Sequence, residues 1–177
     1  MGMSHILVGR PCSALPSIAD VQSACLLIRT LAQELADCTT NPPPGVTVAL
    51  KDESNIFAWT AKLQGPPSSP YEGGTFSLDI TLPRDYPFKV PQVRFMTRIY
   101  HPNVTNDEQG SVCLSILKPE NWKPATKITH VLSSILDLLR EPNPDDPLEA
   151  RIADEFRSQR DEFNKNAKHY VERYAKA

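Results

Sequence analysis

Four short segments between residues 46 and 96 carry the pattern of β-strands and leave little chain between them. Apolar and polar residues alternate at residues 46–50 and 76–82, residues 56–63 are aromatic and β-branched, and residues 92–96 follow a proline-bounded corner. Turn-forming residues fill the connections, most densely at residues 65–74. Parallel strands would need long crossover connections, usually helical. The sequence therefore predicts a four-stranded antiparallel meander.

Helical patterns lie on both sides of this sheet. The first is predicted to begin at Asp20 as N-cap and to end before residues 39–45, which are rich in proline. A strongly amphipathic helix is predicted to end before Pro142, and two more cover about residues 148–157 and 160–175. The apolar positions of the strongly amphipathic helix are Ile128, Val131, Leu132, Ile135, Leu136 and Leu139. The predicted fold class is α+β, with one N-terminal helix, four strands and three C-terminal helices.

The long irregular segment at residues 98–126 separates the strands from the later helices. A compact domain rarely contains a structureless segment of this length unless the segment is functional. It contains Cys113, between a turn that carries an amide side chain and a loop that carries carboxylates. We therefore expect an active-site loop around this cysteine.

Size and charge limit the possible functions. The 177 residues suit a single domain, predicted at residues 19–177 after a flexible N-terminal extension at residues 1–18. A net charge of −2 gives no field that would attract nucleic acid or an anionic membrane. The sequence also lacks a secretory signal and an apolar stretch long enough to span a membrane. We expect neither nucleic acid nor membrane as a partner.

The cysteines indicate neither a metal site nor a disulfide framework. Cys12, Cys25, Cys38 and Cys113 form no CxxC pair and no cluster with histidine at ligand spacing. Free thiols indicate a reducing compartment, the cytoplasm or nucleus. No metal is expected.

Six motifs in a fixed order resemble the ubiquitin-conjugating enzyme (UBC) family. They are PYEGG at 70–74, DYPFKVP at 85–91, YHPN at 100–103, VCL at 112–114, WKPA at 122–125 and PNPDDPL at 142–148. The resemblance covers residues 21–177 and implies a UBC-like fold. Residues 120–126 and 164–167 are most similar to the subgroup that serves ligases with their own catalytic cysteine, of the HECT or RBR type.

The resemblance implies that Cys113 takes ubiquitin from the activating enzyme as a glycyl thioester and passes it to a ligase cysteine or a substrate lysine. ATP is used by the activating enzyme, so this chain needs no cofactor. Asn103 would stabilise the oxyanion, brace the loop, or do both. Asp146 would orient the incoming lysine, with capping of the next helix as the alternative, while Asp145 is expected to cap that helix and His101 to stabilise a turn.

Two departures from the family pattern concern lysine transfer. Ser115 stands where lysine-reactive members often have aspartate, whereas the HECT and RBR subgroup tends to have proline there and histidine at the position of Asp146. The segment between Asn103 and Cys113 is two residues longer than usual, which could shift Asn103 relative to the thiol.

The partners implied by the resemblance are ubiquitin, the activating enzyme and ligases of the HECT, RBR or RING type, with the chain acting as a monomer. Arg29 would meet the activating enzyme. Phe88 is either an exposed ligase anchor or packed inward. Trp59 and Trp122 are expected to be packing residues. The full predicted ligase surface consists of Pro87, Phe88, Lys123, Pro124 and Ala125.

Other functions remain open from the residues alone. The modifier could be a ubiquitin-like protein, because the motifs around Cys113 are shared. A non-catalytic ubiquitin-binding scaffold is disfavoured by the presence of Cys113, and Cys113 could also be a small buried apolar residue. A cysteine protease would need a histidine partner at a recognisable spacing and an oxyanion elbow, and neither is evident.

Overall fold

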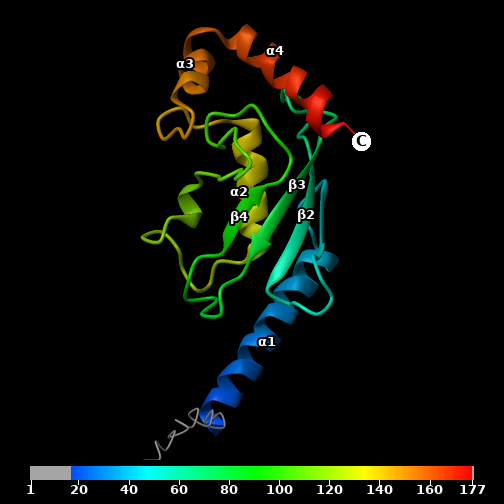
Figure 1. Ribbon diagram of the computed structural model, residues 1–177, viewed down its shortest axis with the longest axis vertical. Coiled ribbons are helices and arrows are strands. Elements are labelled where there is room, and N and C mark those ends of the chain that lie inside the picture. Colours follow the sequence, from blue (N-terminus) through cyan, green and yellow to red (C-terminus); the bar gives the residue numbers. More distant parts are fainter. Residues whose placement is uncertain (1–16, 177) are drawn as a thin grey trace, which may run out of the picture.

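A computed structural model describes residues 17–176, and its elements follow the predicted α+β order (Figure 1). Most of the expected flexible extension, residues 1–16, lies outside the described residues. The elements are α1 (Ile18–Thr40), β1 (Val46–Leu50), β2 (Ala58–Gln64), β3 (Thr75–Thr81), β4 (Gln92–Phe95), the 3₁₀ turn η1 (Ser115–Leu117), α2 (Ile128–Arg140), α3 (Ala150–Ser158), α4 (Arg160–Tyr170) and the π-helical turn η2 (Val171–Ala175). Apart from η1, the segment at 98–126 contains no regular helix or strand among these elements, as predicted.

The strands form one antiparallel sheet in the order β1-β2-β3-β4, so the predicted meander is confirmed. The register aligns Val48 with Ala61, Ala61 with Leu78, and Leu78 with Phe95. All four side chains are buried, so they form a continuous apolar row across one face of the sheet. This face forms one side of the hydrophobic core.

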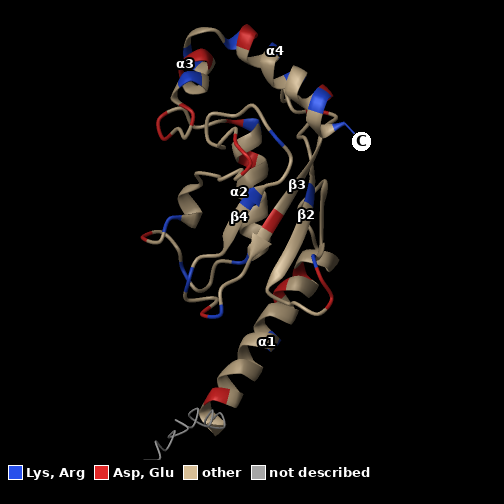
Figure 2. Cartoon of the chain, in the orientation of Figure 1, with Lys and Arg blue, Asp and Glu red and all other residues tan. Residues whose placement is uncertain are grey.

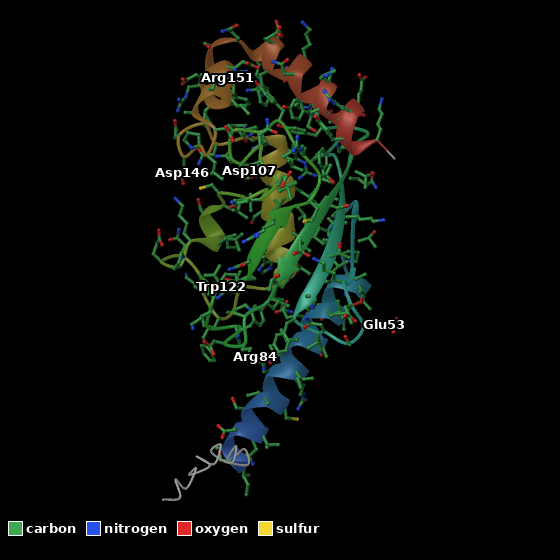
Figure 3. All side chains as sticks on the ribbon, viewed as in Figure 1. Glu53, Arg84, Asp107, Trp122, Asp146 and Arg151 are labelled. Atoms are coloured by element: carbon green, nitrogen blue, oxygen red, sulfur yellow. The ribbon has the colours of Figure 1, made fainter. Side chains whose placement is uncertain are left out.

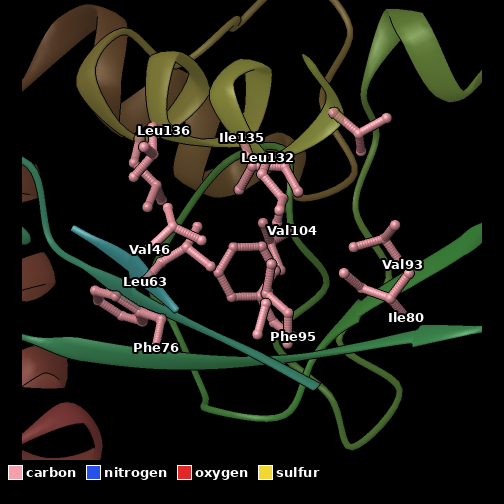
Figure 4. Close-up of a cluster of buried hydrophobic side chains, with 14 of the residues drawn as sticks. Val46, Leu63, Phe76, Ile80, Val93, Phe95, Val104, Leu132, Ile135 and Leu136 are labelled. Carbon is pink, nitrogen blue, oxygen red and sulfur yellow. The ribbon is translucent and has the colours of Figure 1, made fainter. Parts of the chain in front are cut away.

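Helix α2 covers that face and supplies the other side of the core (Figure 4). All six apolar positions predicted for this helix are buried. The helix has no side-chain cap of its own, because its N-cap is Lys127. Instead, Glu34 of α1 accepts a hydrogen bond from the Ile128 N–H at 3.0 Å, and Lys127 pairs with Asp37 of α1 at 2.7 Å. Helix α1 therefore supplies the missing acceptor and fixes where α2 begins.

The prediction that Asp20 is the N-cap of the first helix is wrong. Ser17 is the N-cap, and its hydroxyl oxygen accepts a hydrogen bond from the Asp20 N–H while the Asp20 carboxylate accepts one from the Ser17 N–H. This reciprocal capping box places Asp20 in the first turn. The first half of α1 projects from the body (Figure 1). None of the helices within residues 17–176 has the length and apolar character needed to cross a membrane.

The prediction that Asp145 caps the following helix is also wrong. Helix α3 begins at Ala150 with Glu149 as its N-cap, which forms no side-chain capping bond. The Asp145 carboxylate instead accepts a hydrogen bond from Arg157 at 2.9 Å. Arg157 also donates to the carbonyl of Pro144, so the pair holds the loop before α3 against the end of that helix.

Candidate active site

The irregular segment attaches to the free edge of the sheet. Ser111 forms an isolated bridge with Arg94 of β4, and the Phe95 N–H donates to the Gly110 carbonyl at 2.8 Å. Gly110 has φ of +56°, and a Cβ atom there would lie 1.8 Å from the Phe95 carbonyl oxygen. A glycine is therefore required where the segment meets β4.

The turn that precedes Cys113, which the family resemblance predicted to be two residues longer than usual, is closed by its own side chains. The Asp107 carboxylate accepts hydrogen bonds from the Thr105 hydroxyl at 2.7 Å and the Gln109 N–H at 2.9 Å, which closes the turn on itself. At its base, the Cys113 N–H donates to the Asn103 carbonyl at 2.9 Å. The turn therefore leaves Asn103 and Cys113 directly paired through their backbones.

The Asn103 side chain ties the turn to the loop that carries Asp146. Its Nδ2 donates to the carbonyls of Asn143 at 2.7 Å and Asp146 at 2.9 Å, and its Oδ1 accepts from the Asn143 N–H at 2.9 Å. Asn103 is 1% exposed. Since both amide hydrogens are already bonded to carbonyls, this geometry favours the bracing role over that of a free oxyanion donor.

His101 is structural, as predicted. Its ring is fully buried, with Nδ1 accepting from the Asn103 N–H at 2.9 Å and Nε2 facing the Leu138 carbonyl at 3.0 Å. This pattern requires a neutral ring with the hydrogen on Nε2. Burial lowers the pKa of His101 from 6.5 to about 4. The ring therefore joins the active-site turn to α2 without carrying charge at neutral pH.

His101 is expected to make the folded chain less stable in mild acid. The folded chain resists protonation while the unfolded chain takes up a proton below about pH 6.5, so this contribution is complete above pH 6.5 and is lost as the pH falls towards 4. The loss is roughly 3 kcal/mol at its limit. Urea denaturation at pH 7 and pH 5 measures it, with His101→Gln as the non-titrating variant. The variant should be less stable at pH 7 and lose less between the two values; an equal loss in both proteins would contradict the assignment.

Cys113 is half-buried beside a carboxylate. Its Sγ lies 3.4 Å from Asp146 Oδ2, and both residues line a cavity of about 230 Å³ together with Ser115 and Asn143. Burial, followed by the bond to Asp146, raises the pKa of the Cys113 thiol. Cys25 is exposed on α1, and Cys38 is buried with its pKa raised to about 12, chiefly by burial.

Lys118 is a site residue that the sequence analysis missed. Its ammonium forms an ion pair with Asp146 through the same oxygen that faces Cys113. The Lys118 ammonium lowers the pKa of Asp146, and the carboxylate raises the pKa of Lys118. Ser115 is exposed at the start of η1, and its carbonyl accepts from the Lys118 N–H at 3.2 Å. The turn η1 returns the Lys118 side chain towards the Cys113 thiol. The spacing of residues along the sequence does not reveal this return.

Comparison with known proteins identifies the family of this chain. The family described as "Ubiquitin-conjugating enzyme" matches residues 30–171. The chain belongs to the ubiquitin-conjugating enzyme family. It is 48% identical over 149 residues to "Ubiquitin-conjugating enzyme E2 14" of Schizosaccharomyces pombe, an alignment that covers 84% of this chain and 94% of the relative. It is also 43% identical over 148 residues to "Ubiquitin conjugating enzyme E2 B" of Dictyostelium discoideum, covering 84% and 97% respectively.

Membership of the family, at this level of identity, establishes the class of function and of fold. This ubiquitin-conjugating enzyme is a transferase that works with ubiquitin, the activating enzyme and ubiquitin ligases. The α+β architecture with its N-terminal helix, antiparallel sheet and C-terminal helices is the UBC fold. The first twelve residues of α1, residues 18–29, precede the region that matches the family.

The residues expected to bind a ligase lie on two neighbouring loops. Trp122, which is labelled in Figure 3, is 8% exposed. Its Nε1 donates to the Pro87 carbonyl at 2.7 Å and so joins the two loops. Phe88 is 78% exposed, which rules out the alternative that it packs inward. Lys123, Pro124 and Ala125 are exposed beside Trp122 in the sequence, and Arg29 is exposed on α1. Trp59 is buried in the core, as predicted.

Proposed function

We propose that Cys113 carries the C-terminal glycine of ubiquitin as a thioester, and that this enzyme passes ubiquitin chiefly to the cysteine of a HECT- or RBR-type ligase. The contact between the half-buried Cys113 thiol and Asp146, at a cavity, carries the proposal. Among the described thiols, Cys25 lies out on α1 and Cys38 is buried, so Cys113 alone combines access with a polar partner.

The charging step is an exchange between a thiol and a thioester. The Cys113 thiolate attacks the glycyl carbonyl carbon held by the activating enzyme; a new C–S bond forms, and the cysteine of the activating enzyme leaves as a thiolate. The proton of the Cys113 thiol passes to solvent or to the leaving thiolate. Because one thiolate replaces another, the acyl-transfer potential of the thioester is kept. The step therefore does not require a lowered pKa of the Cys113 thiol, and its raised pKa is compatible with charging.

Two features support a thiol acceptor. Ser115 provides no second carboxylate beside Cys113, and the motif at residues 120–126 is the one that we take to resemble the HECT and RBR subgroup. Asn103 acts as the brace of the loop, and Asp146 would orient a lysine in a slower direct transfer only by giving up its ion pair with Lys118.

The exposed Phe88, with Pro87 and residues 123–125, would anchor the ligase, because an exposed aromatic side chain between prolines suits a binding hot spot. Arg29 would contact the activating enzyme. The enzyme would act as a monomer in the cytoplasm or nucleus, since the free thiols of Cys25 and Cys38 suit a reducing compartment. No metal or cofactor is required by this chemistry.

The experiment is a charging reaction with activating enzyme, ATP and ubiquitin, followed by alkylation of free thiols and peptide mass spectrometry. A band heavier by one ubiquitin that disappears on reduction is expected, with Cys113 protected from alkylation and Cys25 fully alkylated. Transfer to a HECT ligase domain should form a second reducible band faster than a RING ligase promotes transfer to lysine. Protection of Cys25 in place of Cys113, or faster transfer to lysine, would reject the corresponding half of the proposal.

A further inference from the structure

Lys118 places a positive charge at the point where the acceptor must approach. Its ammonium and the Cys113 sulfur both contact Oδ2 of Asp146, so the two groups converge on one carboxylate oxygen. The lysine directly follows η1, whose compact turn returns the side chain towards the thiol. The Lys118 and Asp146 side chains are 37% and 45% exposed, so an acceptor can reach them from solvent.

An ion pair of this kind changes what Asp146 can do. A free carboxylate attracts the ammonium of an acceptor lysine, whereas a carboxylate paired with Lys118 has its charge largely compensated. A second ammonium at Asp146 would also come within a few ångströms of the Lys118 ammonium, and like charges at that range repel. The Asp146 oxygen that would bind the ammonium of an acceptor lysine is therefore already bonded to Lys118.

A thiol acceptor experiences the opposite effect. The reactive form of a thiol is the negatively charged thiolate, which a neighbouring ammonium attracts. The thiolate of Cys113 that leaves during transfer is stabilised by the same charge. Lys118 therefore acts with opposite sign on the two kinds of acceptor.

We propose that Lys118, through its ion pair with Asp146, is a positioning residue that biases the charged enzyme towards thiol acceptors and against lysine. This inference rests on the proposed function of Cys113 as the thioester-carrying residue. Because the pair is partly exposed, the bias is modest, about twofold to fivefold in relative rate. It acts on the choice of acceptor and leaves the bond that forms, an isopeptide or a new thioester, unchanged.

The test is single-turnover discharge of pre-charged enzyme, without ligase, to free lysine and separately to 2-mercaptoethanol. Lys118→Met should raise the ratio of the lysine rate to the thiol rate by about twofold to fivefold. Lys118→Arg should keep the wild-type ratio, because arginine retains the charge. Lys51→Met serves as the matched control, since Lys51 forms a similar exposed ion pair with Asp79 at 2.7 Å, outside the Cys113 cavity.

Each result bears on one of the two proposals. A wild-type enzyme that fails to charge at Cys113 rejects the proposed function, whereas a normally charged Lys118→Met variant with an unchanged ratio rejects only the role of Lys118. Peptide mass spectrometry of the discharged wild-type enzyme adds a second check. Ubiquitin joined to Lys118 itself in most molecules would overturn the inference, because Lys118 would then be the acceptor.

Discussion

Replacing Cys113 with alanine is expected to abolish the reducible ubiquitin adduct completely. Alanine has no nucleophile, and the other described thiols are an exposed Cys25 on α1 and a buried Cys38 whose pKa is raised to about 12. Non-reducing gels of the charging reaction measure the result. Cys25→Ala is the matched control and should charge like the wild type.

Replacing Cys113 with serine separates the chemistry of the sulfur from its position. A serine hydroxyl can form an ester at the same place, but an oxyester exchanges poorly with thiols. The adduct of Cys113→Ser should therefore form slowly, survive reducing agent and be released by hydroxide. A thiol-sensitive adduct on either Cys113 variant would show that another cysteine carries ubiquitin.

Replacing Asn103 with alanine is expected to give the second large effect, on stability and transfer together. The change leaves two carbonyls and one N–H in the loop at residues 142–148 without their partners. Unpaired groups of this kind cost about 1–3 kcal/mol each when buried, and partial access to water reduces the total to roughly 2–4 kcal/mol. Urea denaturation and single-turnover discharge measure the two effects.

Asn103→Asp tests the bracing role more sharply. Its carboxylate can still accept from the Asn143 N–H, but it faces two carbonyls to which asparagine donates. Bracing predicts that both variants lose stability and that transfer slows in the same order. A variant with wild-type stability and transfer slowed about 100-fold or more would instead assign Asn103 to the oxyanion.

The sequence predicted those features that depend on local pattern. The alternation at residues 76–82 and the helical spacing from Ile128 to Leu139 each matched an element, because one buried face imposes a fixed period. Element ends were less accurate. Asp20 and Asp145 are both good capping residues. However, Ser17 is the N-cap of the first helix, and Asp145 accepts a hydrogen bond from Arg157.

Contacts between distant segments were beyond the reach of these patterns. The carboxylate that accepts from the first N–H of α2 belongs to Glu34, which lies 94 positions earlier in the chain. Lys118 was missed for a related reason, since its contact with Asp146 depends on the path of two loops. Figure 2 shows basic and acidic residues distributed along much of the chain, so local charge in the sequence does not mark the site.

The hydrogen bonds that hold the segment before Cys113 against β4 also prevent this strand from pairing with another molecule. An uncovered outer strand presents unpaired N–H and carbonyl groups that can recruit a strand from another molecule. Here Gly110 and Ser111 cover β4 by pairing with Phe95 and Arg94. Conditions that loosen this segment would expose this edge of the sheet to aggregation and would also displace the turn that ends at Cys113. The same few backbone bonds thus hold the turn before Cys113 in place and cover the outer strand.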